Sequence, residues 1–295
     1  MSSPNLCFLL LTGYLGNPDR NPLTVAQFRE LTKRVRGMDA PTQERELEKE
    51  DLLKLGCNDA FSERVLHLLS QEDQALWYLE KGRKHHCYPI LRMEDHYPKG
   101  VRNCLGLDAP ACIWGKGNME ILNNPMIALV GSRDLNTENQ SFAREVGRQA
   151  ALQGYTLVSG NARGADREAQ DSCLAYGGTV VSIVADELYE HPETKNILYL
   201  SEMGFDLPFA ATRALSRNRL IHTMGEKTFV AQCSFGKGGT WSGTTQNLDK
   251  HWNAVFCFDD HSESMQELAQ RGATLLQPEA LISIESLRTD VLTLF

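Results

Sequence analysis

Glycine, hydroxyl-bearing and basic residues gather in three short stretches: Gly131 to Arg133, Ser159 to Asp166 and Gly236 to Thr240. Glycines let a backbone approach a ligand closely, hydroxyl groups donate hydrogen bonds, and an arginine offers a planar fork that matches phosphate. A tight turn would explain any single glycine equally well, but two neighbouring loops that each hold Ser and Arg favour phosphate binding. The candidate residues are Gly131, Ser132, Arg133, Ser159, Gly160, Arg163, Gly164, Asp166, Lys237, Gly238, Gly239 and Thr240.

A fourth basic cluster lies on a predicted helix over residues 211–224, which carries Arg213, Arg217, Asn218 and Arg219. Arg213 and Arg217 are four residues apart and therefore share a helix face. Charges on a helix usually face water, but these lie among apolar residues and so require an ion partner or a bound anion. We favour contact with a ligand.

Two carboxylates accompany these basic residues. Asp166 opens a predicted helix, where it could stabilise the helix N-terminus or contact a ligand, and the sequence does not decide between the two. Glu202 follows a predicted strand and could bind a ribose hydroxyl or act as a base. For Glu202 we favour a third role, an ion pair with one of the arginines.

The chain lacks the motifs of several familiar sites. It has no G-x-x-x-x-G-K-[ST] loop and no G-x-G-x-x-G after the first buried strand, so neither triphosphate hydrolysis nor an ordinary dinucleotide site is supported. It also has no C-x-x-C or H-E-x-x-H spacing, and we expect no metal and no cofactor. No Ser-His-Asp order or carboxylate pair stands out, so the motifs name no catalytic residue.

An alternation of strands and helices must position the four basic stretches. Predicted strands lie at 126–130, 155–158, 179–184, 199–202, 228–231, 254–258 and 274–276. Helices are predicted from 137, capped by Asn136 or Thr137, to the stop at Gly154, and at 165–176, 211–224, 241–250 and 265–271. This order predicts an α/β fold with a doubly wound, mostly parallel, Rossmann-like sheet. Ligands of such sheets bind at the carboxyl ends of the strands, beside helix N-termini that favour anions.

We assign the Rossmann-like domain to residues 126–280 and expect the rest of the chain to accompany it. Residues 1–88 show helical spacing and predict a small helical module of SAM or helix-hairpin-helix type. This module could touch DNA, bind a partner or merely cap the main domain. Residues 89–125 are irregular and rich in proline, as in a connecting segment packed on the core, and 281–295 form a C-terminal tail.

The formal net charge of −8 over 295 residues argues weakly against nucleic acid. The charge is uneven, however, and the basic loops could form a local groove on an acidic protein. The apolar run at 6–11 is too short to cross a bilayer and lacks the basic residues that precede it in a secretory signal. We expect no membrane contact and a cytoplasmic protein.

The order of these motifs resembles the DprA/Smf DNA-processing family. The resemblance covers roughly residues 50 to 276. The DprA/Smf family belongs to a wider group of Rossmann-like (SLOG) proteins that also includes the LOG phosphoribohydrolases. The motifs that carry it are YP (97–98), IALVGSR (127–133), LVSGNARGAD (157–166), GG (177–178), SE (201–202) and RNRLI (217–221).

The resemblance implies a non-enzymatic, homodimeric protein that binds single-stranded DNA and helps to load a RecA-type recombinase during DNA uptake or recombination. It also implies that Arg133, Arg163, Arg217, Arg219 and Lys237 contact phosphates, helped by Gly131, Ser132, Ser159 and Gly160. An alternative is a nucleotide sensor or LOG-like phosphoribohydrolase in a defence or mobile-element system, using the same loops. However, the Glu that LOG enzymes have after the third loop is absent here. A third possibility is an interaction protein that uses its N-terminal helices.

Overall fold

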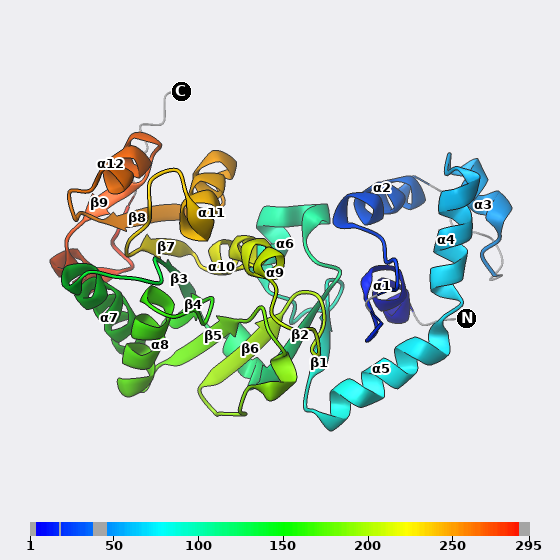
Figure 1. Ribbon diagram of the computed structural model, residues 1–295, viewed down its shortest axis with the longest axis horizontal. Coiled ribbons are helices and arrows are strands. Elements are labelled where there is room, and N and C mark those ends of the chain that lie inside the picture. The colour runs from blue at the N-terminus through cyan, green and yellow to red at the C-terminus, as the bar shows by residue number, and fades with distance from the viewer. Residues whose placement is uncertain (1–3, 18, 38–45, 289–295) are drawn as a thin grey trace.

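The computed structural model describes residues 4–17, 19–37 and 46–288. Within these ranges nine strands form one sheet in the order β1-β2-β6-β5-β4-β3-β7-β8-β9 (Figure 1). The strands from β3 to β9 run parallel, and β1 and β2 extend the β6 side as antiparallel strands. The strands are β1 (Tyr88–Leu91), β2 (Cys112–Gly117), β3 (Met126–Val130), β4 (Thr156–Ser159), β5 (Thr179–Ile183), β6 (Ile197–Ser201), β7 (Lys227–Val230), β8 (Ala254–Phe258) and β9 (Thr274–Leu276).

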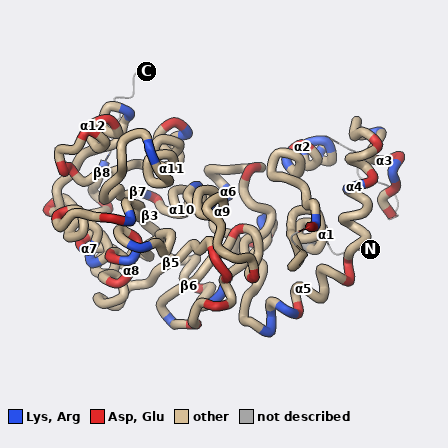
Figure 2. The backbone as a smooth tube through the Cα atoms, in the orientation of Figure 1, with Lys and Arg blue, Asp and Glu red and all other residues tan. Residues whose placement is uncertain are grey.

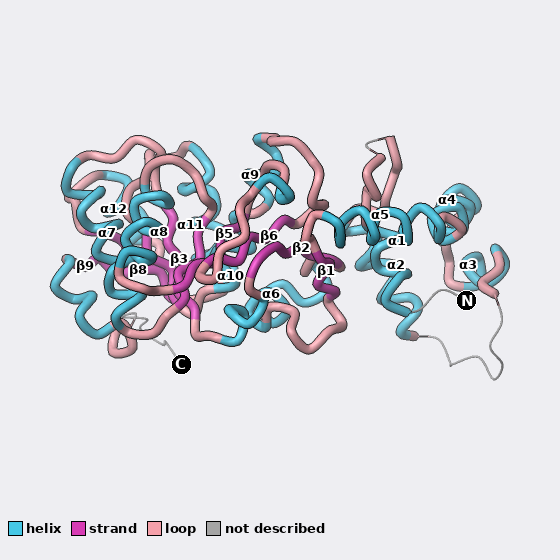
Figure 3. Tube along the Cα trace, turned by 90° about the horizontal axis from the view of Figure 1, so that it is seen from below, coloured by secondary structure: helices cyan, strands magenta, loops and turns pink. Residues whose placement is uncertain are grey.

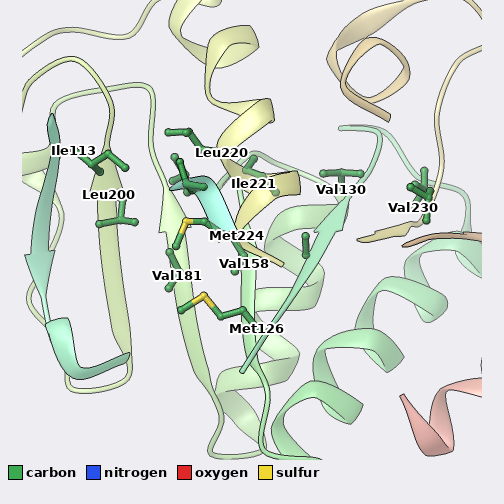
Figure 4. Packing of buried hydrophobic residues seen from close by; sticks show 14 of the residues in the cluster. Ile113, Met126, Val130, Val158, Val181, Leu200, Leu220, Ile221, Met224 and Val230 are labelled. Atoms are coloured by element: carbon green, nitrogen blue, oxygen red, sulfur yellow. The ribbon is translucent and has the colours of Figure 1, made fainter. Parts of the chain in front are cut away.

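The side chains of β3 show why the sheet is doubly wound. Met126, Ala128 and Val130 point into one hydrophobic cluster, whereas Ile127 and Leu129 point into another on the opposite face. A strand buried on both faces reads as a continuous apolar run, as β3 does. Figure 4 shows the first cluster, where Leu220, Ile221 and Met224 lie over the sheet. The predicted α/β fold class is therefore confirmed.

Helices cover both faces of this sheet (Figure 3). Residues of α7 and α8 belong to the cluster on one face, and residues of α6, α10, α11 and α12 belong to the cluster on the other. These helices and their neighbour α9 are α6 (Lys99–Leu105), α7 (Thr137–Leu152), α8 (Ala165–Ala175), α9 (Ala211–Ser216), α10 (Asn218–Met224), α11 (Gly238–Lys250) and α12 (Glu263–Gln270). Short 3₁₀ turns are η1 (Gly106–Asp108), η2 (Met119–Asn123), η3 (Leu188–Glu190) and η4 (Pro278–Ser283).

The N-terminal helices lie at the other end of the molecule, beyond β1 and β2 (Figure 1). They are α1 (Pro4–Thr12), α2 (Val25–Arg36), α3 (Lys49–Lys54), α4 (Asp59–Leu69) and α5 (Glu72–Lys84). Tyr78 of α5 stacks on Phe205 at 4.6 Å between ring centroids and meets Trp114 of β2 edge-on at 5.2 Å. This buried aromatic group joins the helical module to the edge of the sheet.

Three sequence-based expectations need correction. Residues 89–125 are not irregular throughout, because they supply most of β1, all of β2 and α6. The single helix expected at 211–224 is two helices, α9 and α10, which meet at Arg217. The tail expected from residue 281 begins inside the core, where Leu281 and Ile284 are fully buried.

Among the described residues, no helix combines the length and apolar character needed to cross a lipid bilayer.

The strand order reverses between β3 and β7. The chain proceeds from β3 outward through β4, β5 and β6, then crosses back to place β7 on the other side of β3. Loops that leave neighbouring strands in opposite directions open a crevice at the carboxyl end of the sheet, where ligands of such folds bind. The loops after β3 and β7 hold two of the predicted glycine-rich stretches.

Candidate functional site

Two adjoining hollows lie at this carboxyl edge. The larger, of about 420 Å³, lies between the loops after β3 and β7 and is bounded by α9 and the start of α11. The smaller, of about 280 Å³, lies over the loops that follow β4 and β5. Arg133, Ala162 and Arg217 line both hollows. The structure thus brings residues from all four predicted stretches to one edge.

Glycines bring the first two loops into direct contact. A Cβ atom at Gly131 would overlap the Cβ of Ala165, and one at Gly164 would overlap the carbonyl oxygens of Ser132 and Arg133. Gly164 also has φ of +85°, which side chains rarely adopt. The Ala165 N–H donates to the Ser132 carbonyl at 3.1 Å, which closes the contact. These two glycines therefore set the spacing of the loops around the larger hollow.

The Asp166 side chain stabilises the second loop, which follows β4, by hydrogen bonds to its backbone. Its Oδ2 accepts hydrogen bonds from the backbone N–H groups of Gly160 and Ala162, each at 3.1 Å. Burial raises the pKa of Asp166 to about 6, against the opposing effects of Arg217, these two N–H donors and Arg133. Asp166 is thus a residue that shapes the second loop and lines the larger hollow, with a pKa raised to about 6.

The third loop leaves backbone N–H groups unsatisfied at the start of α11. Lys237 occupies the N-cap position without a side-chain cap, so the first N–H groups of this 13-residue helix lack the oxygen that usually satisfies them. By contrast, the Asn136 side chain caps α7. Gly238 has φ of +81° and open space where a Cβ would stand. The Thr240 hydroxyl donates to the Gly131 carbonyl at 2.9 Å and ties this loop to the first.

The side chains of the triplet Arg217, Asn218 and Arg219 form hydrogen bonds to three separate parts of the site. Arg217 donates from Nη1 to the Ile183 carbonyl at the end of β5, at 2.7 Å. Asn218 donates from Nδ2 to the Gly239 carbonyl at 2.9 Å. The boundary between α9 and α10 falls at Arg217, although no Gly or Pro interrupts the segment and Arg217 itself keeps helical dihedral angles.

The side chains of two arginines in this region bind to carbonyl and carboxylate oxygens of the protein itself. Arg213 donates to the carbonyls of Ala185 (2.9 Å), Leu207 (2.6 Å) and Pro208 (2.7 Å). Arg219 forms an ion pair with Glu202 and donates to the Asp108 carbonyl at 2.7 Å. The expected pairing of Glu202 with an arginine is confirmed. Neither Arg213 nor Arg219 lines either hollow, so their expected ligand contact stays a prediction that this geometry does not favour.

The other cations of the site differ in how far their side chains are paired within the described residues. Arg133 and Lys237 are exposed, line the larger hollow, and form no hydrogen bond or ion pair through their side chains. Arg217 is buried, which lowers its pKa, and its Nε has no hydrogen-bond partner. Arg163 is exposed and bonds Asp134 at 2.9 Å. Figure 2 shows basic positions on the loops beside β3 and α11.

The predicted serines differ in their placement. Ser132 lines the larger hollow, but its N–H donates to the Gln232 carbonyl at 2.8 Å. Ser159 is fully buried, and its hydroxyl accepts a hydrogen bond from Gln170 at 2.5 Å. Gln170 therefore links the ends of neighbouring strands, because it also donates to Ser182 of β5.

The sequence analysis missed the apolar residues at the rim. Phe209 lines the smaller hollow and Leu215 lines the larger one, and both are more than half exposed. The only sequence signal was an aromatic residue after Pro208, immediately before the basic helix.

A family model described as DNA recombination-mediator protein A matches residues 89–286 of this chain. The chain belongs to this family. The family's matched region begins in β1 and includes every residue of both hollows. The resemblance to DprA/Smf proteins stated from the sequence is thereby confirmed.

The chain is similar to DNA-processing proteins of several bacteria, and it spans between about 59% and 69% of the length of the two relatives named here. It is 26% identical over 199 residues to DNA processing protein DprA of Streptococcus pneumoniae, covering 62% of this chain and 69% of the relative. It is 25% identical to protein Smf of Escherichia coli, covering 71% of this chain and 59% of the relative. The X-ray structure of S. pneumoniae DprA matches with a TM-score of 0.73 and 22% identity, over 98% of this chain and 99% of the other.

Proposed function

We propose that this member of the DNA recombination-mediator protein A family binds single-stranded DNA along the two hollows. The observation that carries the proposal is that Arg133, Arg217 and Lys237 surround adjoining hollows with charge or donors that the protein leaves unused. Flexible single strands follow such grooves because phosphates meet the cations without any reading of bases.

A related solved structure supports the choice of ligand. The structure of DNA processing protein A from Helicobacter pylori, which is described as having a unique single-stranded DNA binding mode, matches 67% of this chain with a TM-score of 0.57 and 22% identity. The match covers 94% of the H. pylori chain. The two proteins share a fold, and we propose that this chain uses the carboxyl edge of its sheet for the same kind of ligand.

The wider role that we propose follows from the family. The protein would act without catalysis in the cytoplasm, as a homodimer that receives single-stranded DNA during uptake or recombination and helps to load a RecA-type recombinase. A homodimer would present two grooves to one DNA strand. Linked sites of this kind raise the overall affinity through effective concentration. Size-exclusion chromatography with light scattering measures the oligomeric state, and a monomer at micromolar concentration would contradict this part of the proposal.

The binding itself is tested by fluorescence anisotropy with a labelled oligo-dT at low and at moderate salt. We expect binding that weakens steeply with salt, since each phosphate contact releases counterions, and weak competition by duplex DNA. No binding at low salt, or equal competition by a duplex of the same length, would contradict the proposal.

A nucleotide ligand is the second candidate, because the larger hollow of about 420 Å³ falls within the size range of small-molecule sites. A sensor or phosphoribohydrolase would hold one nucleotide there. A ligand that binds only the folded state raises the melting temperature in a saturable way. Thermal unfolding across a panel of mononucleotides separates the two candidates, since the DNA proposal expects only small shifts from any of them.

A further inference from the structure

The two walls of the hollows differ in chemistry. Arg133 and Lys237 lie on loops that follow β3 and β7. Ala211, Ala214 and Leu215 of α9 supply an apolar wall to the larger hollow. Phe209, in the loop just before α9, continues this wall into the smaller hollow.

Phe209 is the most exposed of the Phe, Tyr and Trp residues in the part of the chain that the structure describes. Its side chain is 57% exposed, and it forms no ring–ring or cation–π contact within the described residues. Phe235 is also exposed, but it packs edge-on against Trp241 at 5.0 Å between ring centroids. An exposed, unpartnered ring in a hollow lined by arginines offers a stacking surface to a ligand that is both anionic and aromatic.

We propose that Phe209 stacks on a base of the bound strand, with Leu215 against the neighbouring nucleotide. This inference rests on the proposed function and deepens it, because it assigns the phosphates to the cationic wall and the bases to the α9 wall. Arg133 and Arg217 line both hollows, so a phosphate between them would leave one nucleotide in each hollow.

The arrangement also selects single strands. Bases of a duplex are stacked and paired inside the helix, so their faces cannot reach Phe209 without local melting. Bases of a single strand are free to stack on an aromatic ring, and such stacking tolerates any sequence because every base has a flat face. Inorganic phosphate or an abasic backbone could use the cations but not the ring.

The experiment compares a labelled oligo-dT with a strand of the same length whose central residues are abasic, by fluorescence anisotropy. We expect wild-type protein to prefer oligo-dT by about tenfold, in line with the usual strength of one base stacked on an aromatic ring. Phe209→Ala should lower the affinity for oligo-dT about tenfold and leave the affinity for the abasic strand unchanged. Phe209→Trp, which keeps an aromatic face, should keep the preference.

Matched variants make the outcome specific. Tyr176→Ala removes a ring of similar exposure, 54%, from the C-terminal end of α8 and should change neither affinity. Arg133→Ala should lower both affinities, because it acts on the backbone. Phe209→Ala protein that keeps the wild-type preference, or loses both affinities equally, would overturn the stacking assignment while leaving the DNA proposal intact. Wild-type protein that binds neither strand would overturn both.

Discussion

Basic residues serve opposite purposes on the two sides of the carboxyl edge. On the β6 side, Arg213 and Arg219 are enclosed by carbonyl oxygens and by Glu202. On the β3–β7 side, Arg133 and Lys237 have no protein partner within the described residues, and α11 begins without a side-chain cap. The same residue types therefore hold the fold together on one side and remain available to a ligand on the other.

The comparison shows that a basic motif does not by itself identify ligand contacts. In the triplet at 217–219, Arg219 is anchored to β6 and to the turn before β2, whereas Arg217 keeps an unused Nε at the boundary of both hollows. Arg219 and Arg217 differ in how many hydrogen-bond acceptors lie close to their side chains. Four predictions test this division, beginning with the largest effect.

Arg219→Ala should lower the free energy of unfolding by about 3 to 5 kcal/mol, because it leaves the largely buried Glu202 without its partner. Arg133→Ala should change it by less than about 0.5 kcal/mol, as expected for an exposed residue without contacts. Urea denaturation measures both. Equal losses in the two variants would remove the distinction between the two sides.

Gly164→Ala should destabilise the protein by about 2 kcal/mol and weaken DNA binding, because the added Cβ would push the first two loops apart. Gly154→Ala is the matched control. Gly154 also has a positive φ, +77°, but nothing lies within 4 Å of its added Cβ. Both variants should therefore lose stability from the strained φ, which thermal melting measures. Only Gly164→Ala should lose DNA binding, which anisotropy measures. DNA binding that survives in Gly164→Ala would contradict the role given to the loop contact.

Arg133→Ala should weaken binding of single-stranded DNA by about tenfold, since a hydrogen bond to a charged group contributes about 1.5 to 3 kcal/mol. Arg163→Ala should have a smaller effect, because Arg163 is paired with Asp134 in the free protein and must exchange that partner for a phosphate. Anisotropy titrations at one salt concentration compare them. A larger loss for Arg163→Ala would move the centre of the groove toward the smaller hollow.

The pKa of Asp166 predicts the pH dependence of binding. Burial raises this pKa to about 6, and a bound phosphate would raise it further by repelling the ionised form. Affinity should then increase as the pH falls from 8 toward 5.5, by about tenfold for each unit by which the strand raises the pKa. In the free protein, the raised pKa means that this carboxyl lowers stability as the pH rises from the pKa of Asp in the unfolded chain to about 6, and that its contribution is constant above that range.

Asp166→Asn is the control for this dependence. The variant keeps a side-chain oxygen for the N–H groups of Gly160 and Ala162 but cannot ionise. Its affinity should be flat across the same pH range, and a pH dependence equal to that of the wild type would assign the effect to another group.

Much of the sheet could be predicted from the sequence because its strands are continuous apolar runs. The bounds of β3, β8 and β9 agree with the prediction, since both faces of these strands are buried or helix-covered. Strands β1 and β2 were missed. They are short antiparallel additions, and Pro89 in β1 suggested a loop rather than an edge strand.

The site was predictable as a set of loops but not residue by residue. Local spacing showed that glycines and arginines would meet at one edge, because parallel strands align their carboxyl ends. It could not show that the carbonyls of residues 185, 207 and 208 enclose Arg213, since these acceptors come together only in the folded chain. The exposure of Phe209 likewise depends on how the folded chain packs around it.

The most direct test of the central claim is the salt dependence of oligo-dT affinity in Arg133→Ala/Lys237→Ala protein. Arg144→Ala/Arg148→Ala removes the same charge from α7, where both arginines are paired with glutamates. If the β3–β7 side neutralises phosphates, the slope of log affinity against log salt should fall by about 1.4 in the first variant, two contacts at about 0.7 each, and stay at the wild-type value in the second. An unchanged slope in the first variant, or an equal change in both, would contradict the division of the carboxyl edge into a structural side and a binding side.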